Sequence, residues 1–289
     1  MKVEPKIPAE FPRDGWLQNA SREACREQVW KLGLLTGLKS DGGEFSPANF
    51  ERAIVLDRII ELRKPARILE IGTGRGLGCV SMAASAIAHQ APTRITTLDL
   101  LPSDAKQPWG IQIDGECQQL HASRDEIWSR HIDPTLREPI RQIAGPTTRT
   151  LPALAAAKEK FDFIFIDAGH DLYSVAHDLA YSVELLAAGG AILMDDFAPM
   201  EEFGIGTCIA AQHARRLFEN MEIIPTEGLV FGGAQMEEAP RGMVLLTEPR
   251  KSEASVGRVR LLAWKAAEKV FRLCLDERFF PIRAKSSNR

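Results

Sequence analysis

The sequence has few cysteines and no long apolar run. Its five cysteines are an odd number, lie far apart and form no C-x-x-C pair, so neither a disulfide framework nor a zinc site is expected. No stretch approaches the ~20 consecutive apolar residues of a membrane-spanning helix, and residues 1–13 carry charge and proline where a signal peptide would be apolar. We therefore expect a cytoplasmic protein without a transmembrane segment. Internal repeats are also absent, which favours one large unit with additions at each end.

Charge is divided unevenly along the chain. The 36 Lys and Arg against 39 Asp and Glu give a net charge of −3, but residues 250–289 alone carry +7, which leaves −10 for the preceding residues. An acidic body disfavours nucleic-acid binding. Apolar residues recur at helical spacing between Val259 and Cys274 with basic residues around them, as in a basic amphipathic helix. Such a helix can dock on its own acidic body, on a second subunit as a homo-oligomer, or on an anionic membrane surface; we favour docking within the protein.

From residue 66 onward, short apolar runs alternate with helix-like segments, as in parallel strands joined by crossover helices. Helices are expected from Ser46-Pro47 to about Arg63 and over residues 173–186. Residues 102–139 are too many for a plain crossover and are expected to hold a helix and an insertion near the ligand. Seven strands in this order predict a doubly wound, mostly parallel α/β sheet. The expected strands are Arg67 to Ile71, Arg94 to Leu98, Ile140 to Ala144, Phe161 to Ile166, Ala191 to Met194, Met221 to Ile224 and Met243 to Thr247.

The first predicted strand runs into a loop with glycine at every second position, from Gly72 to Gly78. Such a loop lets a ligand approach the backbone closely, and the following helix offers unpaired N–H groups. A dinucleotide-binding turn would need G-x-G-x-x-G, but the third glycine position is Leu77 or Cys79 here, which weakens that interpretation.

The segment instead fits E/D-x-G-x-G-x-G, with Glu70, Gly72, Gly74 and Gly76, and so resembles motif I of class I methyltransferases that depend on S-adenosylmethionine. The resemblance implies their Rossmann-like fold and a cofactor site that includes Thr73 within the loop. It places Glu70 near the methionine moiety and Asp99, at the end of the second strand, on the ribose hydroxyls. The family has an acidic residue or serine near the adenine after the third strand. Here Pro146 follows the glycine, and Thr147 is the candidate.

The fourth and fifth strands end in Asp167-Ala-Gly-His170 and Asp195-Asp196. These segments resemble the branch of small-molecule O-methyltransferases, of catechol or sugar type, in which such carboxylates hold a divalent metal. The carboxyl ends of adjacent parallel strands share one crevice, so Asp167, Asp195 and Asp196 should converge beside the cofactor and could bind Mg²⁺. The alternative is that an aspartate at a strand end only caps the next turn, as Asp196 could. Some sugar-type relatives have a second Asp where Gly169 stands.

His170 is the candidate general base, because it follows the same strand and titrates near neutral pH. It could equally hydrogen-bond a backbone carbonyl or line the site without transferring a proton. Asp167 is the other candidate catalytic residue. His177, two helical turns further on, is expected on the helix surface. The aromatics of the insertion, including Trp109 and Trp128, are candidates for substrate walls but are more often packing residues.

The sequence therefore predicts a helical cap or lid over residues 1–45, a methyltransferase domain over residues 46–248 and a basic helical tail over residues 249–289. The expected activity is transfer of a methyl group from S-adenosylmethionine to a hydroxyl of a small molecule, such as a sugar, polyketide or phenolic of natural-product biosynthesis, assisted by a divalent metal. The alternatives are a metal-independent enzyme that uses His170 as base, a non-catalytic cofactor-binding module, and an aminopropyl transferase.

Overall fold

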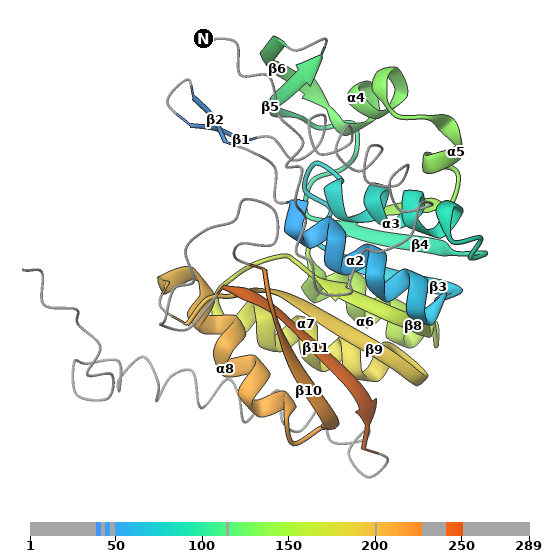
Figure 1. Ribbon diagram of the computed structural model, residues 1–289, viewed down its shortest axis with the longest axis vertical. Coiled ribbons are helices and arrows are strands. Elements are labelled where there is room, and N and C mark those ends of the chain that lie inside the picture. Colours follow the sequence, from blue (N-terminus) through green and yellow to red (C-terminus); the bar gives the residue numbers. More distant parts are fainter. Residues whose placement is uncertain are drawn as a thin grey trace, which may run out of the picture.

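The computed structural model describes residues 39–41, 44–46, 50–113, 116–199, 201–226 and 241–250. A seven-stranded sheet forms its centre, in the order β10-β11-β9-β8-β3-β4-β7 (Figure 1). Five strands run parallel, β11 pairs antiparallel with β9, and β10 pairs antiparallel with β11. The predicted doubly wound, mostly parallel fold is confirmed. The strands are β3 (Arg67–Ile71), β4 (Arg94–Asp99), β7 (Ile140–Ala144), β8 (Phe161–Ile166), β9 (Leu186–Phe197), β10 (Phe218–Pro225) and β11 (Gly242–Pro249).

Helices cover both faces of this sheet, so its central strands are apolar on both sides. Strand β8 shows the alternation: Phe163 and Phe165 pack with one helical layer, and Ile164 and Ile166 pack with the other. The first layer contains α2 (Phe50–Arg63), α3 (Leu77–Ala88), α4 (Arg124–His131) and α5 (Pro134–Arg137), and the second contains α6 (Thr147–Ala156), α7 (Leu172–Leu185) and α8 (Ile205–Ala214). A short 3-10 helix, η1 (Glu202–Gly204), precedes α8.

The long segment after β4 is more elaborate than the expected helix with an insertion. It begins with an antiparallel hairpin of β5 (Lys106–Ile113) and β6 (Glu116–Ser123), continues into α4 and α5, and reaches β7 (Figure 1). Trp109 and Trp128 are both buried in the core. They serve as packing residues, the alternative that the sequence favoured over substrate walls.

Little of the two predicted appendages lies within the described residues. Of the N-terminal segment, the structure describes a small hairpin of β1 (Lys39–Asp41) and β2 (Glu44–Ser46). The predicted helical cap and the basic C-terminal helix lie outside the described residues. None of the described helices is long and apolar enough to cross a membrane.

Candidate active site

The loop after β3 is held tightly against both neighbouring strands. The backbone amides of Gly72 and Thr73 donate to the carbonyl of Leu98 at 2.9 and 3.0 Å, and the amide of Asp167 donates to the carbonyl of Ile71 at 2.8 Å. Gly72 has a φ of +103°, and a Cβ atom there would lie 1.9 Å from the carbonyl oxygen of Asp167. Only glycine permits this approach, which brings the loop directly beside the end of β8.

Glu70 lies beneath the loop and is only 1% exposed. The Thr97 hydroxyl donates to its carboxylate at 2.5 Å, and the hydroxyls of Thr97 and Thr73 are also 2.5 Å apart. Burial raises the pKa of Glu70 to about 7, although the hydrogen bond from Thr97 opposes the rise. Gly78 leaves room for this side chain, because a Cβ there would lie 2.1 Å from Glu70 Oε1. Glu70 and Thr73 thus support the loop from the inside.

Asp99 stands at the end of β4 and faces the same loop. Its Oδ2 accepts a hydrogen bond of 2.7 Å from the amide of Gly74, and its Oδ1 accepts one of 2.8 Å from the amide of Leu101. The guanidinium of Arg124 lies 3.2 Å from Oδ2. Arg124 is fully buried, and sequence reasoning missed it. The capping box formed by Ser123 and Glu126 is a sequence signal that could have placed a helix start at Arg124.

The insertion between β4 and β7 packs against the glycine loop. Helix α4 places Trp128 against Gly76, where an added Cβ would lie 2.2 Å from the indole ring, and the indole N–H donates to the carbonyl of Arg75 at 3.1 Å. Thr147, the first residue of α6, is half-buried. The amide of Gly145 donates to the carbonyl of Asp99 at 2.8 Å, so α6 begins close to the end of β4.

Three carboxylates meet at the ends of β8 and β9. Ile166 and Met194 are paired across the two strands, so the residues that follow them, Asp167 and Asp195, are neighbours. Asp167, Asp195 and Asp196 each offer an oxygen, and these oxygens all lie within 4.8 Å of one another. The predicted convergence is confirmed. We call these three residues the carboxylate cluster.

Arg52 enters the carboxylate cluster from helix α2. Its Nη1 lies 2.6 Å from Oδ2 of Asp167, and its Nη2 forms a second ion pair with Oδ2 of Asp195. Sequence reasoning missed this role, because an arginine near a helix start resembles any solvated charge and its partners are more than 100 residues away. Burial, with the neighbouring Asp195 and Asp196, raises the pKa of Asp167 well above its usual range, and Arg52 opposes that rise.

His170 lies at the edge of the carboxylate cluster. Its Nδ1 is 3.0 Å from Oδ2 of Asp196, and its side chain is 48% exposed. The ring of Phe203, from η1, meets the imidazole edge to face with 6.0 Å between centroids and is itself partly exposed. Phe203 carries no sequence signal, since it lies in a short irregular segment. The expectation for His177 was wrong: it is buried, between Tyr173 and Tyr181 on α7, because this face of α7 packs on the sheet and on α8.

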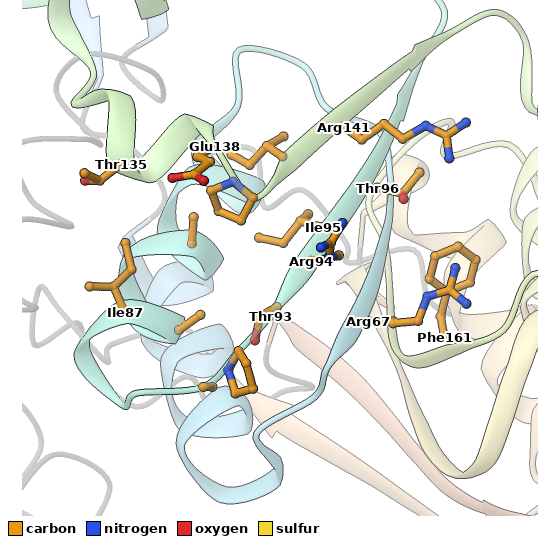
Figure 2. A pocket seen from close by; sticks show the side chains of 16 residues that line it. Arg67, Ile87, Thr93, Arg94, Ile95, Thr96, Thr135, Glu138, Arg141 and Phe161 are labelled. Atoms are coloured by element: carbon orange, nitrogen blue, oxygen red, sulfur yellow. The ribbon is translucent and has the colours of Figure 1, made fainter.

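A separate cavity of about 650 Å³ lies at the opposite edge of the sheet. Figure 2 shows it beside Arg67 and Arg94, the first residues of β3 and β4, with Ile87 of α3 on its far side. Among the described residues that line it, none belongs to the predicted site. The glycine loop, Asp99 and the carboxylate cluster all lie at the carboxyl ends of the strands, where doubly wound folds bind their ligands.

Comparison with known proteins finds similarity to methyltransferases. A family described as a methyltransferase domain matches residues 69–197. The O-methyltransferase hkm8 of Aspergillus hancockii is 29% identical over 133 residues, which is 46% of this chain and 43% of that protein. The match therefore covers less than half of either protein.

Solved structures show the fold. Cofactor-bound Rv0187 from MTB has a TM-score of 0.51 at 17% identity and is matched over 78% of this chain and 89% of its own. An O-methyltransferase from Bacillus cereus in complex with SAH has a TM-score of 0.50 at 16% identity, with coverage of 78% and 91%. The match over residues 69–197 supports the resemblance stated from the motifs: this segment is similar to a methyltransferase domain, and its sheet has the fold of these solved structures.

Proposed function

We propose that the protein transfers the methyl group of S-adenosylmethionine to a hydroxyl of a small molecule. The observation that carries the proposal is the contact between the glycine loop and the end of β8, where Gly72 packs on Asp167. This contact supports a cofactor position next to the loop that bears His170. A methyl donor bound there would share one edge of the sheet with a candidate base, which favours methyl transfer.

The proposed cofactor site follows the motif residues. Gly72, Gly74 and Gly76 would let the cofactor pass close to the backbone, and Asp99 would accept hydrogen bonds from the ribose hydroxyls. Glu70 and Thr73 would act by shaping the loop, since both are buried. Thr147 would lie toward the adenine, and Asp167 toward the methionine end.

His170 would accept the proton of the acceptor hydroxyl. When its Nδ1–H donates to Asp196, its Nε2 keeps a lone pair directed away from that carboxylate. Bound S-adenosylmethionine would supply the methyl group: as the acceptor oxygen bonded to the methyl carbon, the carbon–sulfur bond would break, S-adenosylhomocysteine would leave, and the hydroxyl proton would move to Nε2. The partly exposed Phe203 ring beside His170 suits an acceptor with an apolar or planar face. Sugars, polyketides and phenolics remain within this class.

A metal-assisted version is the second candidate, and the spacing of the carboxylate cluster favours it. Oxygen donors within 4.8 Å of one another are the ligands that Mg²⁺ prefers, so Asp167, Asp195 and Asp196 fit a divalent ion by chemistry. Such an ion would lower the pKa of a bound hydroxyl. However, Arg52 already pairs with two of the three carboxylates, and an ion would have to displace it.

Methyl transfer from labelled S-adenosylmethionine to a library of hydroxylated small molecules tests the proposal. We expect at least one labelled product, and we expect His170→Gln to lower kcat by about 10²-fold or more while cofactor affinity stays unchanged. His213→Gln, on the exposed side of α8, is the matched control and should leave kcat unchanged. Cofactor binding without any labelled product would favour a non-catalytic module. Turnover only with the decarboxylated cofactor would indicate aminopropyl transfer.

A further inference from the structure

Arg52 is the one basic side chain among the described residues that pairs with two members of the carboxylate cluster. Its guanidinium is a planar fork, and the two nitrogens at its end take one oxygen each from Asp167 and Asp195. It also lies 6.0 Å from the ring centroid of Phe165, on strand β8, whose ring belongs to the core between α2 and the sheet. The guanidinium of Arg52 thus lies near the Phe165 ring and forms ion pairs with the carboxylates of Asp167 and Asp195.

The charges at this position explain why a cation is needed. Three carboxylates this close together repel one another, and burial adds the cost of removing them from water. Burial alone would lower the pKa of Arg52, but Asp195, Asp167 and Asp196 outweigh that effect and hold it above its ordinary value. Arg52 therefore supplies a positive charge beside Asp167 and Asp195, and the third carboxylate, Asp196, has His170 as a partner.

We propose that Arg52 is the resident cation of the carboxylate cluster: its guanidinium occupies the position that a divalent metal would take, and it keeps Asp167 and Asp195 in place without one. The inference deepens the proposed function, on which it rests for the placement of cofactor and acceptor, by naming the cation that the site uses. Arg52 is a positioning residue here, because it acts through the two carboxylates.

The geometry makes the guanidinium and a metal ion mutually exclusive. A divalent ion held by Asp167 and Asp195 would compete with Arg52 for the same two carboxylates, and its two positive charges would repel the guanidinium at close range. Substitution of Arg52 by a neutral residue leaves those carboxylates unpaired and clustered, which is the ligand set of a divalent site. The proposal therefore predicts that loss of Arg52 creates metal affinity.

Binding of Mn²⁺, followed by the electron paramagnetic resonance signal of the free ion, tests this directly. The full chain should bind Mn²⁺ weakly, and Arg52→Gln should bind it about tenfold or more tightly. Mn²⁺ should also raise the unfolding midpoint of Arg52→Gln and leave that of the unaltered chain unchanged. Arg58→Gln is the matched control, because Arg58 lies on the same helix but pairs with Glu61. It should behave like the unaltered chain.

The unaltered chain alone can overturn the proposal, even if Arg52→Gln fails to fold. Tight Mn²⁺ binding by that chain, abolished by Asp195→Asn, would show that the metal displaces Arg52 in the native protein. Equal, weak binding by the unaltered chain and a folded Arg52→Gln would likewise contradict the proposal. Cofactor binding is measured separately by calorimetry, so a chain that binds no S-adenosylmethionine refutes the proposed function without bearing on the metal result.

Discussion

At the scale of single residues, Glu70 shows how the acidic position of the glycine motif is used in this chain. Its carboxylate is buried beneath the loop and accepts a hydrogen bond from the Thr97 hydroxyl. The Thr73 hydroxyl is in turn hydrogen-bonded to the hydroxyl of Thr97. Burial raises its pKa to about 7, so the folded protein binds this proton more tightly than the unfolded chain does. The free energy of unfolding should therefore fall as the pH rises from about 4.5, the ordinary value, to about 7.

Replacement of Glu70 by glutamine removes this pH dependence. The amide keeps the size of the side chain and an oxygen that can accept from Thr97, but it carries no charge to bury. Glu70→Gln should raise the free energy of unfolding at pH 8 by about 1–3 kcal/mol and change it little at pH 5. Urea unfolding at both pH values measures the difference.

Glu219→Gln, at an exposed position of β10, is the control for this prediction and should show no comparable pH effect. A Glu70→Gln protein that loses the same stability at pH 5 and pH 8 would contradict the account. That result would mean that Glu70 is held as an anion by interactions stronger than its burial.

At the scale of elements, the glycine loop combines two kinds of glycine. Gly72 is needed by the fold, since its left-handed backbone brings it against the carbonyl of Asp167. Gly74 also has a positive φ, of +54°, but an added Cβ would meet nothing within 4 Å. The open space at Gly74 adjoins Asp99, whose carboxylate accepts from the Gly74 amide, and it is where the proposed cofactor would pass.

Alanine at these two positions should separate folding from binding. Gly72→Ala should lower the free energy of unfolding by about 2–4 kcal/mol, because the methyl group meets backbone atoms that cannot move aside. Gly74→Ala should cost about 1 kcal/mol, the price of a left-handed alanine. It should nevertheless weaken S-adenosylmethionine binding. Urea unfolding and calorimetry of the two variants measure both effects, and equal losses of stability would refute the distinction.

At the scale of the whole molecule, the parallel sheet could be predicted from the sequence with accuracy. Strands β3, β7 and β8 begin and end at the expected residues, because buried parallel strands are short apolar runs with polar boundaries. Their order along the chain then places Asp99, Asp167 and Asp195 at one edge. Strand β9 is longer than expected at both ends, since Leu186 pairs with Phe161 of β8 and Phe197 pairs with Gly242 of β11.

The features that the sequence did not reveal all depend on contacts between distant segments. Arg52 meets Asp167 and Asp195 across more than 100 residues, and Arg124 reaches Asp99 from an insertion that folds as a hairpin followed by helices. No periodic pattern in the nearby sequence distinguishes an arginine that forms such a contact from an arginine exposed to solvent. Within residues 1–249, whose net charge is −10, these two arginines pair with carboxylates of the site. Docking of the basic tail on that acidic body stays a prediction.

The most direct test of the central claim is a calorimetric titration with S-adenosylmethionine. We expect saturable binding at one site. Asp99→Asn, which keeps the shape but loses the charge beside Gly74 and Arg124, should weaken it about tenfold or more, or ~1.4 kcal/mol. Glu219→Gln should bind as the unaltered chain does. A folded chain that takes up no S-adenosylmethionine at millimolar concentration would contradict the account.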